Sequence, residues 1–255
     1  MNTYIQNLNR IEFLITLACT GRCKHCSEGD HTTSGKCIDS NAAVQVIYKL
    51  CNEYNIESLM TFGGEPLLHP DEVCRIHTAA REMNIPERSL ITNGFFSKDE
   101  EKIKSVAMKL GQSGVNGILL LVDAFHQETI PLKPVKDFAK AVQNAGISIR
   151  TNPAWLVNKE AENPYNQQTY EILKEFESMV LMPPREMIFS PEEMHSNTSA
   201  TISTRVKSTS VHILKTQKIY TQSAFILMAA SLAITYINLK LWILLKTIRR
   251  EINQN

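Results

Sequence analysis

The chain has 255 residues with 27 basic and 26 acidic side chains, so it is long enough to bury a sizeable core and carries almost no net charge. The charge is uneven along the chain, because residues 1–194 hold 19 basic and 25 acidic side chains and residues 195–255 hold eight and one. An acidic body without a basic stripe argues against a nucleic-acid-binding surface.

The N-terminal segment and the cysteines indicate the cellular compartment. Residues 1–10 are polar, and the first apolar run, residues 11–17, has the length of a strand rather than of a secretory signal. All six cysteines lie in the first third of the chain, and three of them fall within eight residues. Clustered thiols are typical of a metal site in a reducing compartment, so we expect a cytoplasmic protein.

Short apolar runs alternate with amphipathic stretches as far as about residue 190. Strands are predicted at residues 11–17, 58–62, 89–92, 117–122 and 147–151, with a sixth beginning at 187–189. Helices are predicted over residues 40–54, from Pro70, from a capping box of Ser97 and Glu100, over a stretch that stops at Gly146, and around residues 165–176. We expect an α/β fold, a partial (β/α)6-type parallel barrel with its reactive groups on the loops that follow the strands.

The composition changes abruptly after Met194. All ten glycines, ten prolines and six cysteines precede His195, and residues 224–245 are apolar apart from Lys240 and a few small polar residues. Three explanations stay open: a displaced reading frame or otherwise non-native end, a membrane-inserted helix, which Lys240 disfavours, and an amphipathic helix that covers the barrel. We expect residues 1–194 to form the core, incomplete at its C-terminal end, and residues 195–255 to form an atypical helical or disordered tail.

Three cysteines follow the first predicted strand at the spacing C-x3-C-x2-C, in the segment CTGRCKHC: Cys19, Cys23 and Cys26. Thiolates are soft ligands that suit iron–sulfur clusters, zinc or copper. Structural sites are usually closed by four protein ligands, so three cysteines without an obvious fourth leave a metal position open for a small molecule. The alternative is a zinc knot that takes its fourth ligand from His25, His31 or Cys37.

A glycine-rich motif follows the second predicted strand: Gly63, Gly64, Glu65 and Pro66. Two glycines at this point let the backbone approach a ligand closely and adopt angles that are closed to other residues. An ordinary strand-to-helix turn would also explain a Gly-Gly pair that stood alone.

Together the two motifs resemble those of the radical S-adenosylmethionine (radical SAM) superfamily, in which C-x3-C-x2-C follows the first strand and GGE the second. The resemblance covers roughly residues 10–190. It implies a 4Fe-4S cluster on the three cysteines, with S-adenosylmethionine bound to the free iron and cleaved to a 5′-deoxyadenosyl radical. It also implies that the ring of His25 lies beside the adenine and that residues 63–66 bind the methionine amino group.

Four more polar residues at or near the ends of predicted strands are candidates for the site: Thr92, Asn93, Asp123 and Arg150. Thr92 and Asn93 could reach the cofactor, although a helix-entry turn explains them equally well. Asp123 is the candidate catalytic residue, through the ribose hydroxyls or the substrate, and its alternative role is a local helix cap. Arg150 would hold the cofactor's carboxylate if its side chain points into the barrel.

The remaining candidates are assigned to structure rather than to chemistry. We expect His126 and Glu128 in an exposed loop rather than as a pair that transfers protons or grips a substrate. Trp155 is expected in the core. Three cysteines are left outside the site, two of them as small buried hydrophobic residues of helices: Cys37, Cys51 and Cys74.

The resemblance implies an enzyme that modifies an unknown substrate, with a peptide as one option. Its partner would be a reducing electron donor such as a flavodoxin or a ferredoxin. Nucleic acid is not an expected partner, and membrane contact through the tail is not favoured. Two alternatives stay open, namely a truncated or inactive derivative that binds the cluster without turnover, and a zinc-binding structural module.

Overall fold

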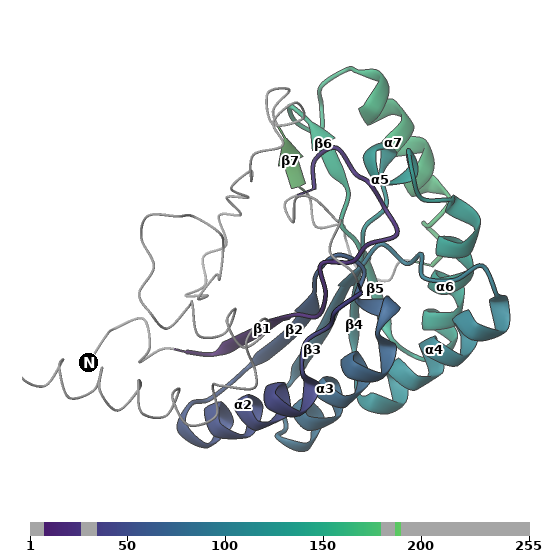
Figure 1. The fold of residues 1–255 in the computed structure, drawn as a ribbon. Helices are drawn as coiled ribbons and strands as arrows, with labels where there is room; N and C mark the ends of the chain where they lie inside the picture. The colour runs from purple at the N-terminus through teal and green to yellow at the C-terminus, as the bar shows by residue number, and fades with distance from the viewer. Residues whose placement is uncertain (1–7, 27–34, 180–186, 190–255) are drawn as a thin grey trace, which may run out of the picture.

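A parallel five-stranded sheet forms the centre of the protein in the computed structural model, which describes residues 8–26, 35–179 and 187–189 (Figure 1). Its strands follow one another in chain order from one edge to the other. They are β1 (Arg10–Leu14), β2 (Ser58–Phe62), β3 (Glu87–Thr92), β4 (Gly117–Leu120) and β5 (Ser148–Thr151). This arrangement confirms the predicted α/β class with parallel strand–helix units.

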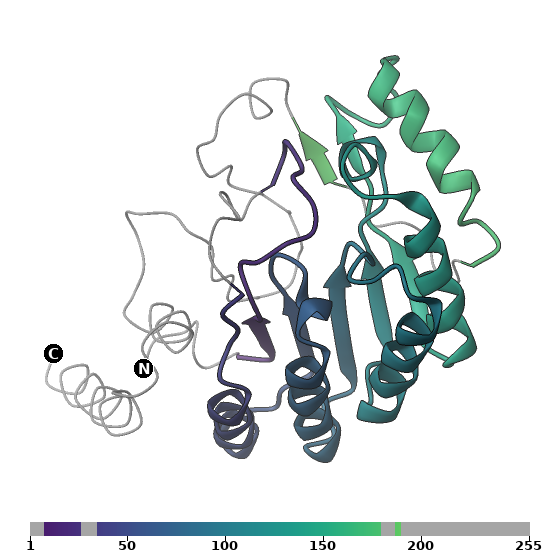
Figure 2. The same cartoon turned by 45° about the vertical axis from the view of Figure 1, so that its right-hand side comes forward.

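Helices lie side by side along one face of this sheet (Figure 2). The long ones that connect its strands are α2 (Ser40–Glu53), α3 (Pro70–Glu82), α4 (Glu100–Ser113) and α6 (Leu132–Asn144). Shorter or later elements are η1 (Pro66–Leu68), α5 (Ala124–Gln127) and α7 (Pro164–Lys174). Within the described ranges no helix is both long and apolar enough to span a bilayer.

One row of buried side chains crosses the whole sheet on the helical side. It consists of Phe13, Thr61, Leu90, Ile118 and Ile149, which are register partners from strand to strand. Alternation along each strand sends the neighbouring residues to the opposite face, so the apolar pattern read from the sequence marks the side that the helices cover. The polar member of the row, Thr61, forms a hydrogen bond with a histidine ring of α3.

His77 of α3 is a neutral histidine of the core. It is fully buried, and its Nε2 lies 2.9 Å from the hydroxyl oxygen of Thr61. Burial, followed by the charge of Arg88, lowers the pKa of His77 to about 3. The ring therefore stays uncharged at neutral pH and ties α3 to β2.

Two short strands form a separate sheet after β5. After Asn152 and Pro153 the chain forms β6 (Ala154–Leu156), which pairs in parallel with β7 (Met187–Phe189). The strand expected at residues 187–189 is thus confirmed. Strand β6 was not predicted, because three residues that follow a proline carry no alternation long enough to recognise. Trp155 of β6 lies in the core, as expected, with 1 % of its surface exposed.

The predicted start of α4 is wrong by two residues. Its N-cap is Asp99, whose Oδ1 accepts hydrogen bonds from the backbone N–H groups of Glu101 and Lys102. The hydroxyl oxygen of Ser97 instead accepts a bond from the N–H of Asp99, 3.1 Å away. Asp and Ser are comparable caps, so the sequence alone does not decide between neighbouring positions. The expected tail, residues 195–255, lies outside the described residues, and its separation from the core stays a prediction.

Candidate active site

The loops after strands β1 to β4 are tied together at one end of the sheet. The hydroxyl of Thr20, in the loop after β1, donates to the carbonyl oxygen of Phe95 after β3, at 2.7 Å. The N–H of Arg22 donates to the hydroxyl oxygen of Thr129, beyond β4, at 3.0 Å. The segment of residues 15–26, which carries the cysteine motif, is therefore held against the loops of two later strands.

Cys19, Cys23 and Cys26 lie in this segment with reduced, partly exposed side chains. Burial, opposed by a hydrogen bond from Gly21, raises the pKa of Cys19 to about 11. Burial, followed by the charges of Asp123 and of the other two thiols, raises the pKa of Cys23 well above its ordinary value. The three sulfurs thus lie close enough to repel one another as thiolates, and a cation would be needed to hold them together in that form.

The spacing of these thiols fits a cluster better than a single ion. Within the described part of the chain, two groups of three metal-type donor atoms lie within 4.8 Å of one another, and neither contains a residue of the cysteine triplet. One zinc ion, with Zn–S bonds of about 2.3 Å, would draw three thiolates closer together than that. An iron–sulfur cluster binds its thiolates on separate irons and therefore spaces them more widely. The donors fit a 4Fe-4S cluster.

Gly63 and Gly64 permit a close approach between the loop after β2 and the segment after β1. A Cβ on Gly64 would lie 2.1 Å from the carbonyl oxygen of Ala18, and a Cβ on Gly63 would lie 2.4 Å from that of Thr16. Gly63 also has a φ of +146°, which disfavours a side chain. The N–H groups of Gly64 and Glu65 donate to these same two carbonyl oxygens at 2.8 and 2.7 Å. Both positions therefore require glycine because the backbone that leads into the cysteine motif passes so close to them.

The carboxylate of Glu65 joins the loop after β2 to the loop after β3. It is fully buried, and it accepts hydrogen bonds from the hydroxyl of Thr92 at 2.7 Å and from the N–H groups of Leu67 and Asn93 at 2.9 Å each. Complete burial raises the pKa of Glu65 to about 7, while the three hydrogen bonds act in the opposite direction. Pro66 begins η1 directly after this capping residue. Glu65 thus positions the GGEP backbone rather than leaving its carboxylate exposed.

Replacing Glu65 with Gln is expected to lower the free energy of unfolding of the full chain by about 1–3 kcal/mol. The amide NH2 group of Gln cannot accept a hydrogen bond. At least one of the groups that now donate to the carboxylate would therefore be buried without an acceptor. Urea unfolding under anaerobic conditions measures the change. Glu82→Gln is the control, since Glu82 is exposed and water can replace the bond of 2.7 Å that its carboxylate accepts from the hydroxyl of Tyr48. Equal unfolding midpoints for the two variants would contradict the assigned role.

Asn93 links the loop after β3 to the cysteine motif. Its side-chain NH2 group lies 3.5 Å from the Sγ of Cys19 and 3.2 Å from the hydroxyl oxygen of Thr20. Its Oδ1 accepts a bond from the N–H of Phe95, which orients the amide. A hydrogen bond to a ligating sulfur is one means by which a protein tunes a cluster. Asn93 therefore reaches a predicted metal ligand.

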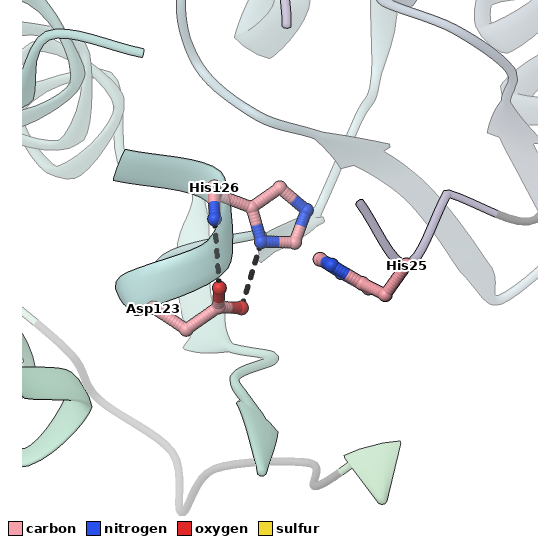
Figure 3. A group of neighbouring side chains, drawn as sticks. All are labelled: His25, Asp123 and His126. Carbon is pink, nitrogen blue, oxygen red and sulfur yellow. Dashed lines mark hydrogen bonds and ion pairs between the residues drawn. The ribbon is translucent and has the colours of Figure 1, made fainter. Parts of the chain in front are cut away.

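Asp123, His126 and His25 form a buried group beside the cysteine motif (Figure 3). Asp123 caps α5, with Oδ1 accepting from the N–H of His126 at 2.9 Å. Its Oδ2 lies 2.7 Å from Nδ1 of His126 and accepts from the N–H of Ala154 at 2.9 Å. The ring of His126 in turn meets that of His25 edge to face, with 4.7 Å between their centroids. Both oxygens of Asp123 are thus engaged in orienting His126 and β6.

The charges in this group are arranged around the carboxylate of Asp123. Burial acts to raise the pKa of Asp123, but the charge and hydrogen bonds of His126 outweigh it and hold that pKa below its ordinary value. Burial, followed by the charge of His126, lowers the pKa of His25 to about 3. His25 is therefore a neutral ring at the edge of the cysteine motif, and it also packs against Phe125 with 5.1 Å between centroids. A neutral, buried ring is suited to packing against an adenine.

The expectation of an exposed loop around His126 is wrong. His126 has 5 % of its surface exposed and belongs to the four-residue helix α5. The ring of His126 packs against that of His25, and its helix α5 is tied to α7 by the bond from the N–H of Ala124 to the hydroxyl oxygen of Thr169. The local sequence indicated Asp123 as a possible helix cap, which it is, but it did not indicate the contacts of α5 with other parts of the chain. Glu128 is exposed as expected, and its carboxylate pairs with Lys24 of the cysteine motif at 3.0 Å.

Arg150 lies in the middle of β5 and is partly exposed. It is the register partner of Leu119, whereas Ile149 is the partner of Ile118 in the row that faces the helices. Alternation therefore places Arg150 on the face opposite to the helices, which is the condition for its expected role. Its proposed contact with a cofactor carboxylate stays a prediction.

One family model matches more than half of the chain. The family model described as the Radical SAM superfamily matches residues 13–166. The probable GTP 3′,8-cyclase of Methanocaldococcus jannaschii is 25 % identical over 123 residues, which are 48 % of this chain and 39 % of that protein. The probable GTP 3′,8-cyclase of Saccharolobus islandicus is 29 % identical over 126 residues, covering 48 % and 37 %. The matched part thus spans about two fifths of the length of these relatives.

Solved structures share the fold. The structure of Streptococcus suis SuiB bound to the precursor peptide SuiA has a TM-score of 0.54 at 14 % identity, covering 72 % of this chain and 40 % of that one. Native anSMEcpe with bound AdoMet has a TM-score of 0.53 at 18 % identity, covering 72 % and 51 %. At such identities the likeness shows the fold alone.

Proposed function

The chain belongs to the radical SAM superfamily, and from this we propose that Cys19, Cys23 and Cys26 hold its 4Fe-4S cluster. The chemistry that the cluster supplies when bound is the one-electron reduction of S-adenosylmethionine, which yields methionine and a 5′-deoxyadenosyl radical. The observation that carries the assignment is that the three cysteines lie in the loop after β1, which is tied to the GGEP loop by backbone bonds to the carbonyl oxygens of Thr16 and Ala18. Enzymes of this superfamily need a reductant, for which we propose a flavodoxin or a ferredoxin.

We assign the cofactor-binding roles to residues around these thiols. His25 would pack beside the adenine, and the backbone of Gly63 and Gly64 would bind the methionine amino group. Glu65, Pro66, Thr92 and Asn93 would hold that backbone in place through the bonds that join the two loops. Arg150 would bind the cofactor's carboxylate, because a guanidinium can form two parallel bonds to it.

Asp123, the predicted catalytic residue, is proposed to act through His126. Asp123 is fully buried and its two oxygens accept bonds from His126 and Ala154, so the ring of His126 is its nearest route to a bound molecule. A bond from Nδ1 of His126 to the carboxylate leaves Nε2 as the ring atom that can exchange a proton with a bound molecule. The expected effect of Asp123 is therefore on the orientation of that ring.

The substrate we favour is a peptide, with a nucleotide as the second candidate. SuiB, which shares the fold, is bound to a precursor peptide in its structure. The curated relatives, which are more similar in sequence, are probable GTP 3′,8-cyclases. The test is to incubate the reduced protein with S-adenosylmethionine and GTP and to measure the remaining GTP. Consumption of GTP would favour the nucleotide, and unchanged GTP would favour the peptide.

Anaerobic reconstitution tests the proposed function. We expect the full chain to take up about four irons and four sulfides and to form 5′-deoxyadenosine from S-adenosylmethionine after reduction with dithionite. Iron analysis and mass spectrometry of the nucleoside measure the two results. A chain that holds the cluster but releases no nucleoside would be the inactive derivative. One zinc per chain with no iron would indicate the structural module and would contradict the proposal.

A further inference from the structure

A second group of metal-type donors lies outside the cysteine triplet. The Sγ of Cys37, a ring nitrogen of His69 and a carboxylate oxygen of Glu72 all lie within 4.8 Å of one another. The three side chains are partly exposed, so an ion can reach them from solvent. They come from two segments, because Cys37 precedes α2 while His69 and Glu72 lie where η1 meets α3. Three different donor atoms from two segments therefore meet at one point, which neither a helix end nor a single cysteine would provide alone.

The backbone around each donor is held by bonds that do not involve the donor side chains. Cys37 forms an antiparallel bridge with Thr16, and the next residue, Ile38, donates its N–H to the carbonyl oxygen of Ile15 at 2.7 Å. The N–H of His69 donates to the carbonyl oxygen of Pro66 at 2.9 Å. Glu72 belongs to the first turn of α3. The donors are therefore presented from ordered backbone on both sides.

From this arrangement we propose that Cys37, His69 and Glu72 bind one divalent transition-metal ion of the zinc type, with water as the fourth ligand. A thiolate, an imidazole and a carboxylate are the three side chains that zinc takes in proteins. Three protein ligands and a water also satisfy its tetrahedral geometry. The site is separate from the cluster and does not depend on the proposed function.

The present distances are compatible with this ion after a small contraction. With bonds of about 2.0–2.3 Å to N, O and S, tetrahedral ligands lie roughly 3.3–3.8 Å apart. Donor pairs that are now within 4.8 Å would need to approach by about 1.5 Å or less, which rotations of partly exposed side chains can supply. The carboxylate of Glu72 already acts on the thiol, because burial and then this charge raise the pKa of Cys37 above its ordinary value.

The bound ion would join two parts of the chain that flank the candidate active site. Cys37 is bridged to Thr16, whose carbonyl oxygen accepts the bond from Gly64. His69 directly follows η1, the short helix that continues the GGEP loop. The ion would therefore link the segment that precedes α2 to the start of α3.

Residue-specific alkylation tests this site in the full chain, purified anaerobically and freed of loosely bound metal. Iodoacetamide labelling followed by peptide mass spectrometry reports the rate at each cysteine separately. We expect added Zn2+ to slow the labelling of Cys37 roughly tenfold or more and a chelator to restore it. Labelling of Cys51 and Cys74 should not respond to Zn2+. Unchanged labelling of Cys37 in the presence of Zn2+ would overturn the proposal.

Matched variants separate this site from general metal binding. His69→Gln and Glu72→Gln are each expected to abolish the protection of Cys37, whereas Asp71→Asn, which changes another acid in the first turn of α3, should keep it. A parallel titration with Co2+, in a chain whose three cluster cysteines are alanine, should produce thiolate-to-cobalt absorption that disappears with Cys37→Ser and survives with Cys74→Ser. The assignment would be refuted if Zn2+ still protected Cys37 from alkylation in both the His69→Gln and the Glu72→Gln variants. Loss of this protection in Asp71→Asn would refute it as well.

Discussion

Cys23→Ala is expected to prevent assembly of the cluster and to reduce the formation of 5′-deoxyadenosine by roughly a hundredfold or more. Cys23 is the middle residue of the triplet, and its thiol interacts with Cys19, Cys26 and Asp123. Two thiolates cannot replace three on a cluster that must keep one iron open for the cofactor. Iron and sulfide analysis after reconstitution, followed by nucleoside measurement, gives both results.

Cys51→Ala is the control for this variant. Cys51 is a partly exposed residue of α2 that packs against the core, away from the cysteine motif. Its replacement should leave iron uptake and nucleoside formation near wild-type levels. If Cys23→Ala formed a normal cluster, or if Cys51→Ala lost it, the assignment of the ligands would be incorrect.

Gly64→Ala is expected to cost about 3 kcal/mol of stability, or more if the loops cannot separate, and to abolish turnover with it. The new methyl group would lie 2.1 Å from the carbonyl oxygen of Ala18 and 2.6 Å from its carbonyl carbon, both of which are backbone atoms. Relief would require the segment before Cys19 to move away from the loop after β2. That movement would break the bond of 2.7 Å from the N–H of Glu65 to the same carbonyl oxygen.

Urea unfolding and the nucleoside assay measure the two effects of Gly64→Ala. Gly117→Ala is the matched control, because a Cβ at this strand position would lie 3.7 Å from the Cβ of Ser89, an ordinary contact. We expect that variant to remain within about 1 kcal/mol of wild type. A Gly64→Ala protein as stable and active as Gly117→Ala would show that the close approach of the two loops is not required.

The fold class and the chemical motif were readable from local spacing. Apolar residues at intervals of two and of three to four predicted the strands and helices, because these periods follow from the geometry of each element. The three cysteines and the glycine pair were recognisable because their spacing and order resemble the paired motifs of the radical SAM superfamily. Arg150 also followed from alternation, which placed it on the face opposite to Ile149.

Other features depended on residues far apart in the sequence. The carboxylate of Glu65 is held by Thr92 and Asn93, which come from the next strand's loop. His126 is buried in a helix of four residues, where its ring meets that of His25 from the cysteine motif. The spacing of apolar residues within one helix or strand does not predict either feature.

Local patterns in the chain were therefore enough to indicate the parallel α/β architecture, the superfamily and the cysteine ligands proposed for its cluster. The folded molecule was needed to explain why Gly64 must lack a side chain, what orients His126, and that Cys37 meets His69 and Glu72. The physical reason is that hydrophobic periodicity arises within one element, whereas these contacts depend on strand register and on the paths of loops that converge at one end of the sheet.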